Sequence, residues 1–332
     1  MLEVKEHGLY CALGDFFIDP TSPVERAVIT HAHADHAVDG STHIWAHEAT
    51  IRILEARWDR SLARSSSPLK YKETTEVGEV GLSLHSAGHV LGSSQVRLDD
   101  GKEIWVVTGD YKRDSDRSCD PFEVVPCHRL VTEATFALPV FKWQPIERLT
   151  QDILRWSEEA FAQDLPVCLF AYSLGKTQRL MAELSAAGHS QFLIHRSADK
   201  ICQIYREFGF PIPDYQIFVN NMEVEGTKGA IIIGPPVLQN SRFLKKHKNI
   251  PSAFVSGWMA LRGMRRRRRL AKGFIMSDHA DWQSLIKTVE QSQAKHVYAT
   301  HGYSDVLSRY LNSKGSIEAD ELLVLRESAE DD

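Results

Sequence analysis

Four side chains that can bind a metal fall within six consecutive residues of this chain, directly after a short apolar run. The run covers residues 27–29 and predicts a strand, and it leads into Thr30-His31-Ala32-His33-Ala34-Asp35-His36. Imidazole and carboxylate groups together suit zinc, and also manganese or iron in a site of mixed nitrogen and oxygen ligands. Core packing does not explain such a cluster, so we expect a fold that places a metal site at the end of a strand.

Three further candidate ligands also follow predicted strands and stand next to a glycine. They are His89 in Ala87-Gly88-His89, Asp110 in Thr108-Gly109-Asp110 and His301 in Thr300-His301-Gly302. Taken singly, each is equally well explained as a turn residue or a cap. Their shared position at strand ends favours a metal site, and together with the first cluster they are enough for two ions.

The pattern of apolar residues changes near residue 139 and again near residue 272. Up to residue 139, short apolar runs separated by turn residues predict strands, with one helix at 48–58. From 140 to 272, helical and strand patterns alternate, which indicates βαβ units around a parallel sheet. Two more strand-to-helix pairs follow from residue 273, with their strands at 274–276 and 296–300. The sequence therefore predicts an α/β chain in two parts.

Composition narrows the class of protein without fixing its activity. The chain has 332 residues, of which 43% are hydrophobic and 25% charged, as in globular proteins. A net charge of -5 argues against a protein that binds nucleic acid over its whole surface, but it leaves a local basic groove open. The five scattered cysteines contain no C-x-x-C pair and are expected to be reduced thiols. The charged N-terminal residues and the absence of a long apolar run favour a cytoplasmic location over secretion or membrane insertion.

The segment His31-Ala32-His33-Ala34-Asp35-His36 resembles the H-x-H-x-D-H motif of the metallo-β-lactamase superfamily. The resemblance implies an αββα sandwich that binds two divalent ions, zinc in the first place and manganese as the second choice. The first ion would be held by His31, His33, His89 and Asp110, and the second by Asp35, His36, Asp110 and His301. Asp19, with Asp15 as the weaker candidate, corresponds to a carboxylate that orients a histidine ligand.

Three segments resemble the β-CASP branch of that superfamily, whose members cleave nucleic acid. They are Val131-Thr132-Glu133-Ala134-Thr135-Phe136, Met276-Ser277-Asp278-His279-Ala280-Asp281, and His301. This resemblance implies a metallo-β-lactamase domain at 1–139 and 273–332, and an inserted α/β β-CASP domain at 140–272. Length and the run from Ser277 to Trp282 are most similar to the bacterial ligase-associated DNA exonucleases, also described as mRNA 3′-end processing factor-like.

The implied activity is metal-dependent DNA cleavage, as an exonuclease in DNA repair, beside an ATP-dependent DNA ligase and a helicase. In such enzymes two ions activate a shared water, and the resulting hydroxide attacks the phosphodiester. Asp35, His279 and Glu133 are the implied catalytic residues. His279 would stabilise charge on the scissile phosphate or donate a proton to the leaving group, and Glu133 would orient it, although an ion pair of purely structural value explains Glu133 as well.

A basic segment precedes the His279 motif and is a candidate nucleic-acid contact. It has seven cations within eleven residues: Arg262, Arg265, Arg266, Arg267, Arg268, Arg269 and Lys272. Such a run is either a solvated face or a surface that follows a phosphate backbone, with Trp258 available for stacking. Lys176 is a further candidate, at a strand-to-helix junction that resembles the corresponding junction of the β-CASP branch. A P-loop is the alternative, but Phe170 stands where that motif needs glycine.

Three other functions remain open at this point. A ribonuclease of the RNA 3′-end processing type is supported by His301. A hydrolase of small thioesters or lactones is opposed by the insertion and the arginine run, because it needs no cationic groove. A nucleic-acid-binding scaffold without catalysis is opposed by the complete set of metal ligands.

Overall fold

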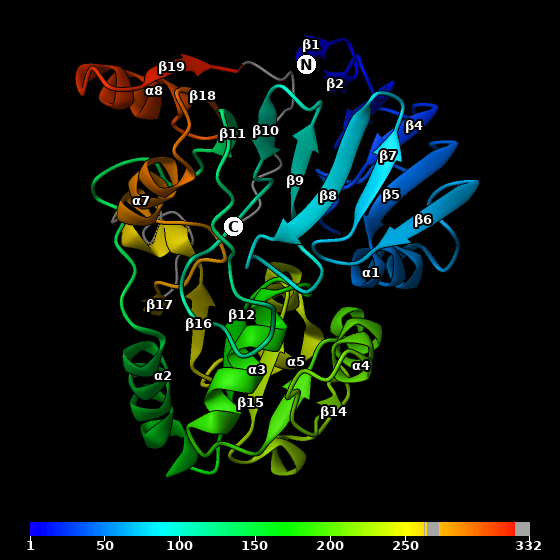
Figure 1. The fold of residues 1–332 in the computed structure, drawn as a ribbon. Helices are drawn as coiled ribbons and strands as arrows, with labels where there is room; N and C mark the ends of the chain where they lie inside the picture. The colour runs from blue at the N-terminus through cyan, green and yellow to red at the C-terminus, as the bar shows by residue number, and fades with distance from the viewer. Residues whose placement is uncertain (262, 264–271, 323–332) are drawn as a thin grey trace. The chain divides into compact units, whose positions relative to one another are not determined.

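The computed structural model describes residues 1–261, 263 and 272–322, and these fall into two compact units (Figure 1). The first unit comprises Met1–Asp114, Cys119–Lys142 and, of the residues that follow the second unit, 279–322. The second comprises Ser115–Ser118 and Trp143–Asp278. Among the described residues, no helix is both long and apolar enough to cross a membrane.

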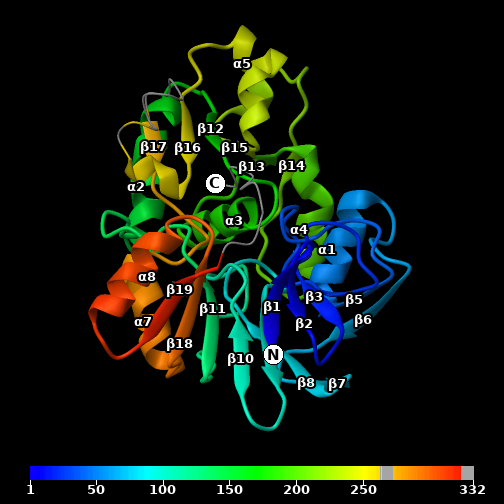
Figure 2. The same cartoon turned by 90° about the horizontal axis from the view of Figure 1, so that it is seen from above.

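The first unit contains two sheets. One has six strands in the order β1-β2-β3-β4-β5-β6, antiparallel up to β3 and parallel from there. Its strands are β1 (Leu2–Lys5), β2 (Gly8–Cys11), β3 (Phe16–Ile18), β4 (Arg26–Val28), β5 (His43–His47) and β6 (Ser65–Leu69). Helix α1 (Glu48–Trp58) follows β5 and packs beside β5 and β6 (Figure 2).

The second sheet has seven strands in the order β19-β18-β11-β10-β9-β8-β7. Strands β7 to β10 pair antiparallel, whereas β10, β11, β18 and β19 are parallel neighbours. The bounds are β7 (Thr74–Val77), β8 (Val80–Ser86), β9 (Ser94–Asp99), β10 (Ile104–Val107), β11 (Arg129–Glu133), β18 (His296–Thr300) and β19 (Glu318–Glu321).

Successive residues along the strands of the second sheet point to opposite faces, and each face contributes to a separate hydrophobic core. Val107 and Val131 face a cluster that also contains Phe16 and Ile18 of the first sheet, so the two sheets pack face to face. Val106 and Leu130, one residue earlier, face the opposite cluster with helices α7 (Trp282–Ser292) and α8 (Ser304–Ser313). The helices therefore cover the outer face of this sheet (Figure 2).

The second unit is built around one sheet in which every pairing is parallel, in the order β14-β13-β15-β12-β16-β17. Its strands are β12 (Val167–Phe170), β13 (Phe192–Ile194), β14 (Gln216–Ile217), β15 (Ile231–Gly234), β16 (Ser252–Val255) and β17 (Lys272–Phe274). Its helices are α2 (Ile146–Phe161), α3 (Lys176–Ala186), α4 (Asp199–Glu207) and α5 (Arg242–Lys246). The central strands β12 and β15 are buried throughout, as their continuous apolar runs predict.

Most predicted elements occur where the sequence places them, and the prediction of a mixed α/β chain is confirmed. The helix at 48–58 is α1, but the strand expected at 274–276 lies earlier, as β17 (Lys272–Phe274). Seven strands were not predicted, namely β1, β2, β5, β6, β7, β14 and β19. Several of them, such as β6 (SSSPL) and β19 (EADE), are polar and lie at sheet edges, so their sequences carry little apolar alternation.

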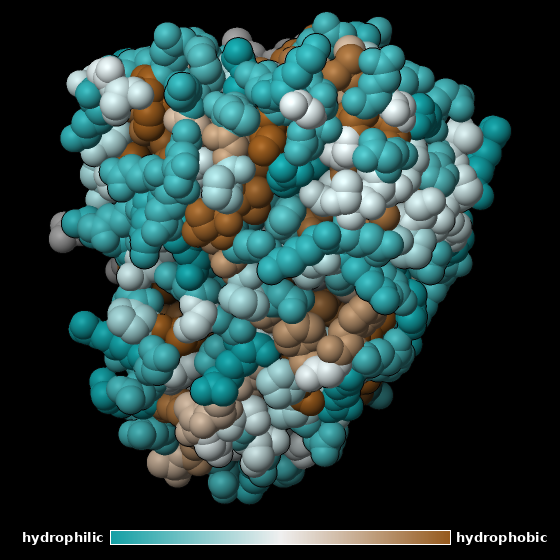
Figure 3. Space-filling model, in the orientation of Figure 1, coloured by the Kyte–Doolittle hydropathy of each residue, from teal (hydrophilic) through white to brown (hydrophobic). Residues whose placement is uncertain are grey.

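Many buried apolar side chains belong to these cores. On the face drawn in Figure 3, hydrophilic side chains cover most of the surface and hydrophobic ones show as patches between them.

Candidate metal centre

Strand order brings the candidate ligands of the first unit together. Strands β10, β11 and β18 are parallel neighbours, so their carboxyl ends share one edge of the sheet. Asp110 follows β10, Glu133 ends β11 and His301 follows β18. The loop after β4 supplies the residues from His31 to His36, and the loop between β8 and β9 supplies His89.

The first group of ligand atoms consists of three imidazole nitrogens and one carboxylate oxygen. His33 Nδ1 lies 3.1 Å from His31 Nε2 and 3.1 Å from His89 Nε2. Asp110 Oδ2 lies 3.5 Å from His31 Nε2 and 3.8 Å from His89 Nε2. All four atoms lie within 4.8 Å of one another.

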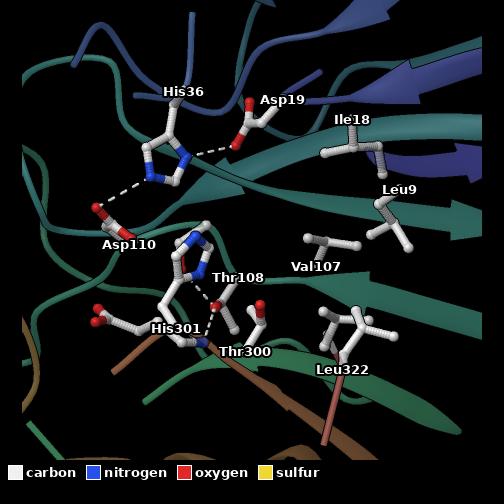
Figure 4. Close-up of a pocket in the computed structure, with 13 residues that line it drawn as sticks. Leu9, Ile18, Asp19, His36, Val107, Thr108, Asp110, Thr300, His301 and Leu322 are labelled. Carbon is white, nitrogen blue, oxygen red and sulfur yellow. Dashed lines mark hydrogen bonds and ion pairs between the residues drawn. The ribbon is translucent and has the colours of Figure 1, made fainter. Parts of the chain in front are cut away.

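A second group of candidate ligands also lies beside Asp110, and Figure 4 shows its His36 between Asp19 and Asp110. His36 Nε2 is 3.4 Å from Asp110 Oδ2 and 3.5 Å from Asp35 Oδ2. The opposite nitrogen, His36 Nδ1, is 2.7 Å from Asp19 Oδ2, so Asp19 fixes which ring nitrogen faces Asp110. Asp19 is in turn held by Thr30, whose backbone N–H and hydroxyl donate to the carboxylate over 2.7 and 2.5 Å.

His301 also lies beside His36, but it is not in the groups whose candidate ligand atoms lie within 4.8 Å of one another. Its ring centroid is 5.8 Å from that of His36, and its backbone has a positive φ of 62°. It lines a cavity of about 40 Å³ together with His36, Asp110 and Glu133, over an apolar floor that includes Val107 and Val131 (Figure 4).

Glu133 and His279 form a buried pair beside Asp110. Glu133 Oε2 accepts a hydrogen bond from His279 Nδ1 at 2.8 Å, and Glu133 Oε1 accepts one from the Tyr111 backbone N–H at 2.7 Å. Suitable atoms of Asp110, Glu133 and His279 also lie within 4.8 Å of one another. No sequence pattern predicts the Tyr111 or Thr30 contacts, because they join backbone groups and a hydroxyl to side chains from other strands.

Burial and neighbouring charges set the protonation of these groups. Burial lowers the pKa of His31 well below its usual value and that of His33 to about 4, and the Arg57 guanidinium also lowers the pKa of His33. Burial acts to lower the pKa of His36 as well, but the Asp110, Asp35 and Asp19 carboxylates outweigh it and raise that pKa well above its usual value.

The two buried carboxyl groups shift in opposite directions. Burial acts to raise the pKa of Asp110, but the charges of His36 and His279 outweigh it and hold that pKa well below its usual value. Burial raises the pKa of Glu133, against the opposing effect of His279.

The residues fit a pair of divalent cations. Four ligands at about 2.1 Å from one ion stand about 3.4 Å apart in a tetrahedron, close to the spacing of the first group. The neutral His31 and His33 rings have lone pairs to offer, and three nitrogens with one oxygen suit zinc. Within the described residues, the buried Asp35 Oδ1 has no hydrogen-bond partner, as expected of an oxygen that faces a cation.

The residues predicted to contact nucleic acid differ in their exposure to solvent. Lys272 is exposed, and Trp258 is half-buried against the core of the second unit. Lys176 is only 2% exposed, with its ammonium 5.0 Å from the Tyr172 ring centroid, which differs from the surface position that a phosphate contact requires. The remaining candidates lie outside the described residues: Arg262, Arg265, Arg266, Arg267, Arg268 and Arg269.

Sequence comparison finds relatives that match nearly all or part of this chain. A "Probable DNA ligase" of Opitutus terrae is 30% identical over 313 residues, which cover 93% of this chain and 30% of that protein. "Endoribonuclease YSH1" of Kluyveromyces lactis is 27% identical over 128 residues, which cover 37% of this chain and 16% of that protein. The chain thus spans less than a third of the length of these curated relatives. No family model matches it.

A solved structure shares the fold. A protein of unknown function from Enterococcus faecalis V583 superposes with a TM-score of 0.60 at 13% identity, covering 91% of this chain and 80% of that one. The sequence relatives confirm the resemblance read from the motifs, and the chain belongs to the β-CASP branch of the metallo-β-lactamase superfamily.

Proposed function

We propose that this chain is a metal-dependent nuclease that hydrolyses phosphodiester bonds in DNA as an exonuclease. The observation that carries the proposal is that one carboxylate oxygen, Asp110 Oδ2, lies within 3.8 Å of ring nitrogens of His31, His89 and His36. A carboxylate so placed can bridge two cations, and two cations are suited to a phosphoryl group. A relative named as a DNA ligase and one named as an endoribonuclease support nucleic acid as the substrate.

The architecture supports the same proposal. We assign the first unit to a metallo-β-lactamase αββα sandwich, because two packed sheets carry α1 on one side and α7 and α8 on the other. We assign the second unit to the inserted β-CASP domain, because an all-parallel sheet with intervening helices interrupts the first unit in sequence.

His31, His33, His89 and Asp110 would hold one ion, and Asp35, His36 and Asp110 the other, with His301 at the cavity wall as its further ligand. Bound there, divalent ions, with zinc preferred to manganese, supply a Lewis acid for the phosphate and lower the pKa of water. Asp19 keeps His36 Nε2 turned toward Asp110 through the hydrogen bond to Nδ1.

His279 acts on the departing oxygen, and Glu133 positions His279. The hydrogen bond from His279 Nδ1 to Glu133 fixes the ring and leaves Nε2 as the nitrogen that contacts substrate. His279 Nε2 then stabilises charge on the phosphate or passes a proton to the leaving oxygen, and the Glu133 carboxylate stabilises the imidazolium before that transfer.

DNA repair beside an ATP-dependent ligase and a helicase is the context that we propose. Its support is the relative from Opitutus terrae, a single protein named as a ligase that includes a region similar to nearly all of this chain. Contacts with DNA beyond the cleavage site are assigned to Lys272 and Trp258 of the second unit.

A ribonuclease of the RNA 3′-end processing type is the second candidate, favoured by the endoribonuclease relative. Cleavage of matched, end-labelled single-stranded DNA, duplex DNA and RNA, with Zn²⁺ or Mn²⁺, tests both. We expect DNA to be shortened progressively from an end. Preferential cleavage of RNA would favour the second candidate, and cleavage of none of the three substrates by metal-loaded protein would refute both.

A further inference from the structure

The loop that follows β4 carries candidate metal ligands and is exposed to solvent in its middle part. His31 is 0% exposed, and exposure then rises along the loop, with His33 and Asp35 half-buried and Ala34 exposed. A substrate that comes from solvent therefore reaches the ligand atoms past residues 33–35. The groups that line this approach determine how a charged substrate is received.

Arg57 lies beside this approach. It is an exposed residue in the last turn of α1, and its Nη1 donates a hydrogen bond to the carbonyl of Ala32, between the ligands His31 and His33. Its guanidinium carbon also lies 5.3 Å from the centroid of the Trp58 ring. The loop contact and the ring contact together hold a cation beside the loop that carries His31 and His33.

The charges of the site make a cation at this position useful. Asp19, Asp35, Asp110 and Glu133 place four carboxylates at the centre, and a nucleic-acid backbone that approaches them is itself negative. A guanidinium presents planar N–H donors that match two phosphate oxygens at once. We propose that Arg57 contacts a backbone phosphate of the substrate next to the scissile bond, an inference that rests on the proposed nuclease function.

Arg60 offers a matched control. It is also an exposed arginine, with a side chain 60% accessible, and its Nη2 contacts the same loop further along, at Asp39 Oδ2. Replacing either arginine by glutamine removes one charge and one contact with the loop. Only Arg57 makes that contact between two candidate metal ligands.

The test measures binding of phosphorothioate-protected single-stranded DNA, as a function of salt, by the zinc-loaded full chain and by the variants Arg57→Gln and Arg60→Gln. We expect Arg57→Gln to bind about tenfold more weakly and its plot of log affinity against log salt to be less steep by about one phosphate contact. Arg60→Gln should stay close to wild type. A series of oligonucleotides with one methylphosphonate each should contain a position that weakens binding by wild type and leaves Arg57→Gln unaffected.

Each other outcome is decisive. If no methylphosphonate position distinguishes wild type from Arg57→Gln, or if Arg60→Gln loses as much affinity, Arg57 does not contact a particular phosphate and the inference is overturned. A zinc content in Arg57→Gln reduced in step with affinity would show that Arg57 only holds the ligand loop. Wild-type protein that neither binds nor cleaves nucleic acid would instead refute the proposed function itself.

Discussion

Asp19 and His36 are joined by a hydrogen bond of 2.7 Å between Oδ2 and Nδ1, and this bond leaves the opposite nitrogen of His36 facing Asp110. The backbone of Asp19 has a positive φ of 45°, a conformation that costs energy in a residue other than glycine. The protein therefore maintains a strained residue to hold one imidazole.

The first prediction concerns this pair. Replacing Asp19 by Asn removes the charge that orients His36, so we expect the affinity for the second divalent ion to fall about 10- to 100-fold while the first ion is retained. Zinc titration with a competing chelator measures both affinities. Asp15→Asn is the control, because Asp15 also has a positive φ but is exposed and pairs with Tyr10. Equal losses in both variants would contradict the assigned role of Asp19.

The second prediction concerns His279. His279→Ala should bind two metal ions and lower the single-turnover cleavage rate by about 10²- to 10⁴-fold, since proton transfer and charge stabilisation at the leaving oxygen are lost. The control is His296→Ala, which removes another histidine paired with a glutamate, through Nδ1 and Glu318 at 3.0 Å, outside the site. A His279→Ala protein that cleaves at nearly the wild-type rate would refute this role.

The third prediction uses the opposite pKa shifts of the histidines. Burial lowers the pKa of His33 to about 4, so that ring is already neutral at pH 7 and releases no proton when the first ion binds. The carboxylates around His36 raise its pKa above the usual value, so the ring carries a proton at pH 7 that the second ion must displace. Calorimetry in buffers of different ionisation enthalpy should show more proton release, and a steeper gain in affinity between pH 6 and 8, for the second ion. Equal proton release for both ions would contradict the opposite pKa shifts of His33 and His36.

The fourth prediction concerns the glycine after His301. Gly302 has a φ of +53°, and a Cβ there would stand 2.4 Å from the Cα of Thr135. Gly302→Ala should lower the free energy of unfolding by about 1–3 kcal/mol more than Gly101→Ala, because overpacking adds to the cost of the positive φ. Gly101 has a φ of +79° but nothing within 4 Å of its Cβ position. Urea unfolding measures the difference, and equal losses would rule out the close approach.

The fifth prediction concerns the thiols. All five cysteines are buried and free, and burial raises the pKa of Cys127 and of Cys202 to about 12. At pH 8 only about one thiol in 10⁴ is then ionised at these two positions, so a disulfide reagent should react slowly with the native protein and with all five thiols after denaturation. A thiol in the native protein that reacts as fast as free cysteine would contradict this burial.

The sequence predicts those candidate ligands that cluster in one short segment or follow a predicted strand. The segment from His31 to His36 and the residues Asp110 and His89 stand out because few other roles explain imidazoles and carboxylates beside glycine at strand ends. The exact place of His301 does not follow from such a pattern, because its distance from His36 depends on how β18 pairs with β11. The ring of His301 lies at the cavity wall, outside the groups whose ligand atoms lie within 4.8 Å of one another.

The fold is predictable to a similar extent. Buried parallel strands such as β12 and β15 are apolar runs, and α1 buries Ile51 and Leu54 at helical spacing, so local sequence identifies them. Edge strands such as β6 and β19 are formed by pairing with a neighbour, and their own residues are mostly polar. The burial of Lys176 follows from tertiary packing, which its position after a strand does not reveal.

The pairing of β11 with β18 also determines when the site can exist during synthesis. Glu133 and Thr300 are direct partners across this pair, although the main part of the second unit, Trp143–Asp278, is encoded between them. At ribosomal speed that stretch takes on the order of ten seconds or longer to make, and until it has emerged neither His279 nor His301 is available. The candidate metal centre therefore cannot be completed on the nascent polypeptide before residue 301 has been translated.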